Sequence, residues 1–207
     1  IIIIILKITG EGEIFFLQKR IGKNKNFINL YKFATMLKNS PNIGTGTLTI
    51  GDDPRILPFG KFLRKTKINE LPQIVNILIG HMSFIGPRPL TEEGFKNYEA
   101  DIQKKIIKLK PGLSGIGSLI FFNEEELLRQ NNNPVYMWKN IISPYKGELE
   151  TWYFKNINLM NYFLLIILTF LILVLPIKIN IFNVFKTLPK PPSKLKKFKD
   201  FKFNYVD

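Results

Sequence analysis

An amide, a carboxylate and two arginines lie close together in this 207-residue chain. They are Arg64, Asn69, Glu70 and Arg88, all in the stretch from Phe62 to Leu90. Guanidinium groups bind phosphate oxygens through paired hydrogen bonds, and the start of a helix offers free backbone N–H groups to an anion. The grouping therefore predicts a site for phosphate chemistry, with a diphosphate lying near the start of a helix.

An apolar stripe indicates the helix that must position this site. Its members recur at helical spacing and are Leu71, Ile74, Val75 and Leu78. Pro72 fits the first turn, where its missing N–H has no intrahelical partner. Asn69 then falls near the N-cap and Glu70 just inside the helix. A simpler alternative stays open, in which Asn69 only caps the helix and Glu70 only complements its dipole.

Arg88 lies between two prolines in the segment Gly86-Pro87-Arg88-Pro89. Proline fixes its own φ and restricts the residue before it, so this backbone is stiff and loses little entropy when a ligand binds. A guanidinium presented in this way suits bidentate phosphate contact. A rigid surface turn is the alternative interpretation.

Two strands are predicted upstream of the site, at 12–21 and 27–36, joined by a turn at 22–26. Lys32 projects from the second strand, either toward a ligand or toward solvent. Downstream, apolar spacing predicts one helix from Phe95 to Leu109, ended by the Pro-Gly pair at 111–112. A further helix is predicted to begin with Ser143 as N-cap and to continue through Trp152 and Tyr153, two aromatics that suit a membrane interface or a core.

Composition limits the class of protein. A chain of 207 residues with 45% hydrophobic content can bury one core. Zero cysteines exclude disulfides and thiolate metal sites, and one histidine excludes a multi-histidine zinc site. We predict an α+β fold: a mostly helical single domain with a small N-terminal β-hairpin, associated with one face of a membrane.

The net charge of +14 calls for an anionic partner, and its distribution favours a membrane over nucleic acid. An uncharged run at 162–177 is about 24 Å long as a helix, which is short of a bilayer core and suits an interfacial helix. A buried core helix is the alternative. The tail from Lys186 to Lys202 then carries seven lysines and one aspartate, a cluster that anionic headgroups attract; a solvated end is its alternative.

The ordered motifs resemble those of the bacterial sugar transferases, the monotopic polyprenyl-phosphate phosphoglycosyl transferases. The resemblance covers about 12–176 and rests on FFLQKRIGKNKNF, LYKFATM, RKTKINELPQ, GPRP, KPGLSGIGS and ELETWY. Three residues depart from the family pattern. Asn69 stands where the family has its nucleophilic Asp, His81 stands where it usually has Asp, and Ala34 stands where many members have Arg.

The resemblance implies an activity and roles for the site residues. The enzyme would move a phosphosugar from a UDP-sugar to polyprenyl (undecaprenyl) phosphate and release UMP, as the first membrane step of cell-surface glycan synthesis. Asn69 and Glu70 take the catalytic positions, and Glu70 would bind Mg²⁺. Lys32, Arg64 and Arg88 would bind substrate phosphate. Anionic lipids are further partners, nucleic acid is not, and no motif decides between a monomer and a homodimer.

The resemblance also implies a location and a division of the chain. We expect the cytosolic face of the bacterial inner membrane. Residues 1–9 are interpreted as the remnant of a re-entrant membrane helix, 10–161 as the transferase domain, 162–182 as an apolar membrane-associated helix and 183–207 as a basic tail. The apolar start without Met suggests that the chain is a fragment.

Because Asn69 has no anionic oxygen, three functions stay open. In the first, an active transferase lets the lipid phosphate attack directly in a ternary complex. In the second, a catalytically silent relative binds the lipid or a partner transferase. In the third, the chain is a basic membrane-surface or nucleic-acid binding protein without enzymatic activity.

Overall fold

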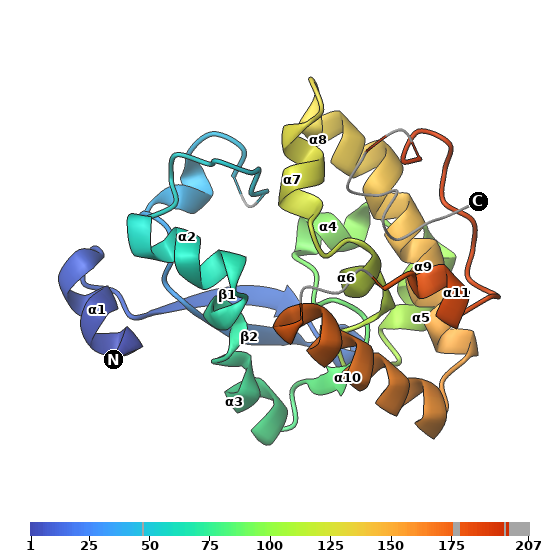
Figure 1. The fold of residues 1–207 in the computed structure, drawn as a ribbon. Helices are drawn as coiled ribbons and strands as arrows, with labels where there is room; N and C mark the ends of the chain where they lie inside the picture. Colours follow the sequence, from blue (N-terminus) through green and yellow to red (C-terminus); the bar gives the residue numbers. More distant parts are fainter. Residues whose placement is uncertain (47, 176–178, 197, 199–207) are drawn as a thin grey trace.

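The fold is mostly helical, with one antiparallel hairpin and one short parallel strand pair. The computed structural model describes residues 1–46, 48–175, 179–196 and 198. The helices are α1 (Ile2–Thr9), α2 (Pro58–Lys65), α3 (Gln73–Leu78), α4 (Glu92–Lys96), α5 (Ala100–Ile106), α6 (Ile116–Ile120), α7 (Glu124–Arg129), α8 (Pro134–Met137), α9 (Ser143–Lys155), α10 (Leu159–Val174) and α11 (Ile181–Val184). The strands are β1 (Phe15–Ile21), β2 (Phe27–Phe33), β3 (Ser83–Ile85) and β4 (Gly112–Ser114). The predicted α+β class is confirmed, and Figure 1 shows the hairpin beside α2 and α3, with the helices from α4 onward across from it.

The hairpin is the element that turns charged side chains toward the interior. β1 and β2 pair antiparallel from Phe15↔Phe33 to Ile21↔Phe27, so both predicted strands exist but are shorter than predicted. Side chains alternate between the two faces of a strand. Ile28 and Leu30 are buried, which places Lys32 on the same inner face of β2. The paired positions put Arg20 opposite Ile28, and Arg20 therefore shares that face.

The parallel pair joins two segments that are distant in the sequence. Ser83 pairs with Gly112 and Ile85 with Ser114. The Gly112 amide donates to the Pro87 carbonyl at 2.8 Å, and the Gly86 amide donates to the Ser114 carbonyl at 3.0 Å. A Cβ on Gly112 would lie 2.1 Å from the Gly86 nitrogen, so only glycine allows this approach. The backbone before Arg88 is thereby fixed.

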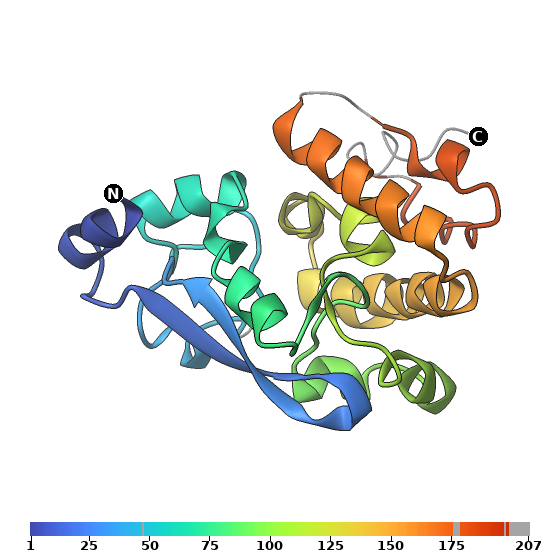
Figure 2. The same cartoon turned by 90° about the horizontal axis from the view of Figure 1, so that it is seen from below.

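The main core lies between α6, α9 and α10 and extends under the C-terminal segment. Figure 2 shows α10 stacked over α9, with the chain after α10 returning beside them. Leu149, Leu165, Ile181 and Leu195 are fully buried there. The Trp152 indole donates to the Thr187 hydroxyl at 3.0 Å. Trp152 and Tyr153 are both buried. Of the two roles predicted for them, at a membrane interface or in a core, their burial supports the core.

Two helix predictions are wrong in detail. The single helix predicted from Phe95 to Leu109 is two helices, α4 and α5, because Glu99 is extended, with ψ of 148°. The helix predicted to begin at Ser143 has no N-cap there, since Ile142 is itself helical. The chain instead passes from α8 through a π-helical segment, Trp138–Ile142, into α9.

The apolar stripe at 71–78 faces outward. A 3₁₀ turn, Ile68–Glu70, precedes α3, and the side chains buried in α3 are the polar Gln73 and Asn76. Asn76 accepts from the Tyr31 amide at 3.1 Å and donates to the Asn29 carbonyl at 2.8 Å. These bonds fix α3 to β2 by its polar side and leave Leu71, Ile74, Val75 and Leu78 exposed.

No helix among the described residues is both long and apolar enough to cross a membrane. The helix α10 runs from Leu159 to Val174, so it begins before the predicted apolar run at 162–177 and covers most of it. The predicted basic tail is described only to 196 and at 198, where Leu188 and Leu195 are buried. Its last residues, 199–207, lie outside the described part. The predicted division of the chain into four segments stays a prediction.

Candidate functional site

A buried carboxylate surrounded by cations forms the centre of the site. Lys32 Nζ lies 3.1 Å from Glu70 Oε1, and an Arg88 guanidinium nitrogen lies 3.5 Å from the same oxygen. The side chains of Lys32 and Glu70 are 16% and 18% exposed, whereas that of Arg88 is 40% exposed. Arg88 is therefore the member of this trio most open to a ligand.

Three separate elements bring the trio together. Lys32 comes from the inner face of β2. Glu70 ends the 3₁₀ turn at 68–70, which begins after Lys67, a residue held at a φ of 58°. Arg88 follows β3, on the backbone that Gly112 fixes. Two of the predicted phosphate-binding residues, Lys32 and Arg88, therefore meet the predicted catalytic Glu70 in space.

The ionisation of the trio follows from burial and mutual charge. Burial by itself raises the pKa of Glu70, but the positive charges of Lys32 and Arg88 outweigh it and hold this pKa well below its usual range. Burial lowers the pKa of Lys32 to about 8, which the charge of Glu70 only partly offsets. The charge of Glu70 raises the pKa of Arg88. Glu70 is thus an anion at neutral pH.

Two further cations, Arg20 and Lys67, belong to this cluster and were not identified from the sequence. Burial and the charge of Arg88 lower the pKa of Arg20, and Glu70 opposes this. Burial lowers the pKa of Lys67, against the charges of Glu125 and Glu70. The hairpin register is the signal for Arg20. Lys67 could have been found from its place three residues before Glu70.

Asn69 does not act as a helix cap. Neither the 3₁₀ turn nor α3 has a side-chain cap hydrogen bond, which excludes the capping interpretation of this residue. The residue is 5% exposed, and its Oδ1 has no hydrogen-bond partner among the described residues. A buried amide oxygen without a donor is costly, so this atom is suited to accept a bond from a ligand.

Arg64 lies in the same pocket but outside the Glu70 cluster. Its guanidinium pairs with the Glu125 carboxylate and lies 3.8 Å from Met36 Sδ. The side chain is 18% exposed. The predicted phosphate role of Arg64 therefore requires a ligand to share this arginine with Glu125, because its charge is already balanced in the free protein.

A second charged group, formed by Glu124, Lys146 and Glu150, lies near Arg88. It was also not identified from the sequence. Lys146 Nζ donates to Glu124 Oε2 at 2.6 Å. Burial raises the pKa of Glu150 to about 8, and the backbone amide of Arg88 lowers it only partly by donating to this carboxyl group. Glu124 and Glu150 each have one buried oxygen without a hydrogen-bond partner. Charged residues on an otherwise buried helix, α9, were the available signal.

With the exception of Glu150, these groups line one cavity of about 760 Å³, within the usual range for sites that hold a small ligand or cofactor. The charged residues that line it include Arg20, Lys32, Lys67, Glu70, Arg88, Glu124 and Lys146. Neutral residues of the loop 40–49, including Ser40, Thr45 and Thr49, also line it. The cavity therefore offers cations to an anionic group and hydroxyls to a neutral one.

The cavity contains oxygen atoms of the type that binds Mg²⁺. Among the described residues there is no group of three or more acidic or histidine side chains that could hold a metal by themselves. Mg²⁺ commonly takes one or two carboxylates and completes its shell with substrate phosphates and water. The Glu70 carboxylate and the partnerless Asn69 Oδ1 are oxygen ligands of this type. They fit a Mg²⁺ ion that arrives with a diphosphate.

Residues 1–176 match the family described as "Bacterial sugar transferase". The galactosyl transferase CpsE of Streptococcus agalactiae is 38% identical over 115 residues, which are 51% of this chain and 25% of that protein. The UDP-glucose:undecaprenyl-phosphate glucose-1-phosphate transferase of Escherichia coli is 37% identical over 112 residues, 53% of this chain and 24% of that protein. The undecaprenyl-phosphate galactose phosphotransferase of Salmonella typhimurium is 29% identical over 170 residues, 75% of this chain and 32% of that protein. The matched part of the chain thus spans between a quarter and a third of these relatives.

Proposed function

Because the chain belongs to the bacterial sugar transferase family, we propose that it moves a sugar phosphate from a UDP-sugar to polyprenyl phosphate. The products are a polyprenyl diphosphate sugar and UMP. The names of the Escherichia coli and Salmonella typhimurium relatives state transfer to undecaprenyl phosphate, and this lipid is the acceptor that we propose here. The reaction would begin the synthesis of a cell-surface glycan.

The observation that carries this proposal is the excess of cations around Glu70. Arg20, Lys32, Lys67 and Arg88 all interact electrostatically with the Glu70 carboxylate. The nearby Glu125 and Glu124 are paired with Arg64 and Lys146, so positive charge remains in excess around Glu70. An anion with at least two negative charges compensates this excess. Both proposed substrates meet that requirement, because one carries a diphosphate and the other a phosphate.

We assign roles to the cluster on this basis. Arg88 is more exposed than Lys32 and would contact the diphosphate directly, as a planar guanidinium suits. The protonated Nζ of Lys32 would donate hydrogen bonds to both Glu70 and a phosphate oxygen. An oxygen of the lipid phosphate attacks the phosphorus that carries the sugar, and the bond from this phosphorus to the bridging oxygen breaks. UMP leaves with the electron pair, so no proton has to move.

Asn69 shapes this mechanism because it is neutral. An amide oxygen is a poor nucleophile for phosphorus, so direct attack within a ternary complex is the route that fits this residue. Its partnerless Oδ1 would accept a hydrogen bond from the donor substrate or bind Mg²⁺ together with Glu70. Bound Mg²⁺ would neutralise charge on the diphosphate as it separates.

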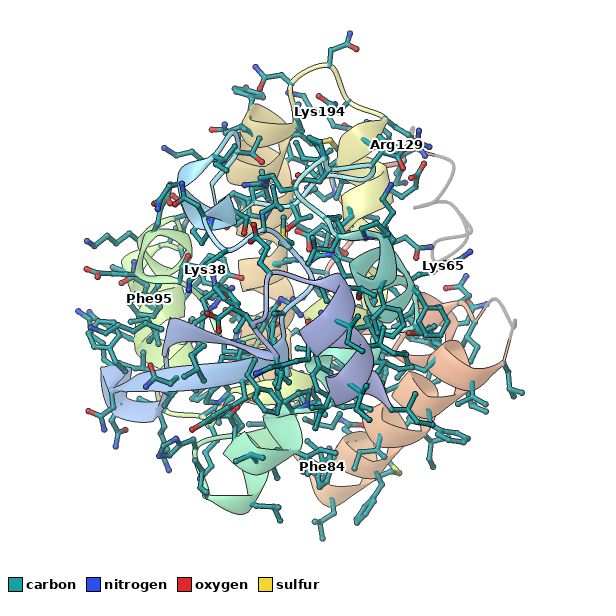
Figure 3. The ribbon with its side chains drawn as sticks, turned by 90° about the vertical axis from the view of Figure 1, so that its left-hand side faces the viewer. Lys38, Lys65, Phe84, Phe95, Arg129 and Lys194 are labelled. Carbon is teal, nitrogen blue, oxygen red and sulfur yellow. The ribbon has the colours of Figure 1, made fainter. Side chains whose placement is uncertain are left out.

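The membrane surface that we propose consists of the exposed apolar residues of α3, Phe84 and α10. On α10 they are Leu159, Met160, Phe163, Ile167, Phe170, Leu173 and Val174. Figure 3 shows Phe84 at the lower edge of the molecule, between α3 and α10. A contiguous apolar face of this kind marks an interaction surface, and an excess of lysine favours anionic lipid. Docking at the cytosolic face of the inner membrane would place the cavity beside its lipid substrate.

The proposal is tested by measuring UMP release from the protein reconstituted in anionic vesicles with polyprenyl phosphate, Mg²⁺ and a panel of UDP-sugars. The Glu70→Gln variant should lose at least about a hundredfold in kcat/KM, because it lacks the carboxylate that orients Lys32 and Arg88 and would bind Mg²⁺. Glu92→Gln is the matched control, since this glutamate is 59% exposed and pairs only with Lys96 nearby. Release that needs no lipid would contradict the proposal.

A silent relative is the second candidate, and Asn69 is the observation that favours it. Without an anionic oxygen at position 69 the cavity could still bind the nucleotide sugar or the lipid. In that case the folded, membrane-bound protein binds a UDP-sugar but releases no UMP in the same assay. Turnover that disappears in Glu70→Gln would exclude this candidate.

A further inference from the structure

One buried arginine organises the loop that forms the neutral wall of the cavity. Arg55 is 4% exposed. One guanidinium nitrogen donates to the carbonyls of Ser40, Ile43 and Gly46, at 2.8, 2.6 and 2.7 Å. The other donates to the Leu48 carbonyl and the Thr45 hydroxyl, both at 3.0 Å. A single side chain therefore binds four carbonyls of one loop.

The arginine is itself held from below. Asp53 is 6% exposed and accepts from Arg55 Nε at 2.8 Å and from a terminal guanidinium nitrogen at 2.6 Å. The base of the loop is closed by the backbone bridge between Met36 and Ile56. Planar guanidinium geometry holds many acceptors at once, which an ammonium group cannot do. The described loop residues are thus fixed in one arrangement.

This loop contains no charged residue from Asn39 to Gly51. Ser40, Thr45, Gly46, Leu48 and Thr49 all line the cavity that also holds the Glu70 cluster. The Thr45 hydroxyl is engaged by Arg55 and the Leu48 carbonyl. Thr49 lines the cavity without a hydrogen bond to Arg55, so its hydroxyl is the best placed of these groups to meet a ligand.

We propose that the described residues of this loop, 40–46 and 48–49, held by Arg55, are the wall that selects the sugar of the nucleotide-sugar donor, with Arg55 as a positioning residue and Thr49 as a contact. This inference rests on the proposed function. The phosphates occupy the cationic part of the cavity, and the sugar is bonded directly to them. A neutral wall with hydroxyl groups suits a neutral ring that carries several hydroxyls, whereas a polyprenyl chain requires an apolar path.

A rigid polar wall of this kind would also discriminate between sugars. A site that hydrogen-bonds a substrate hydroxyl rejects analogues in which that hydroxyl is missing or inverted, because its own polar groups then lose their partners. Such discrimination requires a wall that does not shift. Arg55 supplies this rigidity without touching the substrate, since its guanidinium donors are used on the loop and on Asp53.

The experiment compares Arg55→Lys, Thr49→Ala and the control Asn42→Ala with wild type. Asn42 lies in the same loop, but its side chain donates a hydrogen bond to Asn39 and does not line the cavity. For each protein we would measure kcat/KM for a panel of UDP-hexoses and UDP-N-acetylhexosamines, the KM for polyprenyl phosphate, and the affinity for UDP and each UDP-sugar. Circular dichroism checks the fold, and Thr49→Ala is decisive if Arg55→Lys does not fold.

We expect Thr49→Ala and Arg55→Lys to lower the preference for the best sugar over the next by about tenfold, the upper end of the effect of one lost neutral hydrogen bond. Asn42→Ala should keep the wild-type preference, and the KM for the lipid should not change. If the folded variants keep the wild-type sugar preference, the inference is overturned. The proposed function is not affected by that result as long as the proteins still transfer the sugar phosphate. An equal loss of affinity for UDP and for every UDP-sugar, with unchanged sugar preference, would assign the wall to the nucleotide and overturn it too.

If wild type binds UDP-sugars without turnover, the ratio of their affinities replaces the ratio of kcat/KM. The same change in Thr49→Ala then supports the inference although transfer is absent. Failure of wild type to bind any UDP-sugar would overturn both the inference and the proposed function.

Discussion

Lys32 Nζ contacts Glu70 Oε1 at 3.1 Å across 38 positions of sequence. The pair joins the hairpin to the 3₁₀ turn before α3 and is the centre of the charged cluster. Its two members respond differently to burial. Glu70 stays ionised because several cations surround it, whereas the pKa of Lys32 falls to about 8 because its single nearby anion does not offset burial and neighbouring cations.

The first prediction concerns the pH dependence of the free enzyme. Lys32 carries its proton below its pKa of about 8 and loses it above, so phosphate binding should weaken on the alkaline side. We expect kcat/KM of wild type to fall about tenfold per pH unit above that value. The arginine in Lys32→Arg keeps its charge at any accessible pH, so kcat/KM of this variant should begin to fall only at a higher pH than in wild type. An identical alkaline limb in the variant would contradict this role of Lys32.

The second prediction concerns position 69. An aspartate there would line the same cavity as Arg20, Lys32, Lys67 and Arg88. These cations favour its ionised form, which supplies the missing nucleophile. We expect Asn69→Asp to raise turnover about tenfold or more and to change intersecting reciprocal plots into parallel ones, with a phosphosugar adduct visible by mass spectrometry. Asn140→Asp, on the exposed side of the molecule, is the control. Slower turnover with intersecting plots would show instead that the amide itself is required.

The third prediction concerns Glu150 and stability. Its pKa is raised from 4.5 to about 8, so between these values the folded state binds a proton that the unfolded state has lost. The free energy of unfolding should therefore fall as the pH rises from 4.5 to 8. Glu150→Gln keeps an acceptor for the Arg88 amide and cannot ionise, so its stability should be flatter over this range and higher than wild type at pH 8.

Urea denaturation at pH 5, 6.5 and 8 measures this effect. The control is Glu99→Gln, an exposed glutamate in the turn before α5. If Glu150→Gln and wild type lose stability in parallel between pH 5 and 8, another group is responsible for the pH dependence.

Local spacing predicted much of the site. The hairpin, the position of Glu70 near a helix start and the stiff backbone around Arg88 all follow from residues close in sequence. Proximity of Lys32 to Glu70 came from the family resemblance, since no local rule relates β2 to the turn at 68–70. Arg20 was missed because its position depends on strand register, which fixes the face of every residue in the pair.

Burial of polar residues explains the other differences. Apolar spacing indicated the helix α3 but not the face by which it packs. Asn76 fixes this helix to β2 by hydrogen bonds, and the apolar stripe faces outward. Lys146 and Glu150 are buried on α9 in spite of their type, because Glu124 pairs with Lys146 and the Arg88 amide donates to Glu150. Such pairs are contributed by distant segments, and the sequence of α9 alone does not reveal them.

The fourth prediction tests the glycine that fixes the Arg88 backbone. A methyl group on Gly112 would lie 2.1 Å from the Gly86 nitrogen, so Gly112→Ala must displace β3 from β4. We expect it to reduce the free energy of unfolding by about 3 kcal/mol, the upper range for overpacking. Gly94→Ala is the control, since its methyl group would come no closer than 3.2 Å to Thr91 Oγ1. Equal stability of the two variants would contradict this account.

The last prediction separates the proposed membrane surface from exposed apolar residues elsewhere. Phe163 on α10 and Tyr136 on α8 are 58% and 54% exposed, but only Phe163 belongs to the proposed surface. Burying a phenylalanine in an apolar environment contributes about 2 kcal/mol, so Phe163→Asn should weaken binding to anionic vesicles about tenfold or more. Tyr136→Asn should bind as wild type does. Vesicle co-sedimentation at low and high salt measures both changes and separates the apolar part, which persists in salt, from lysine attraction, which salt screens. Equal losses in the two variants would mean that the face formed by α3, Phe84 and α10 does not bind the bilayer.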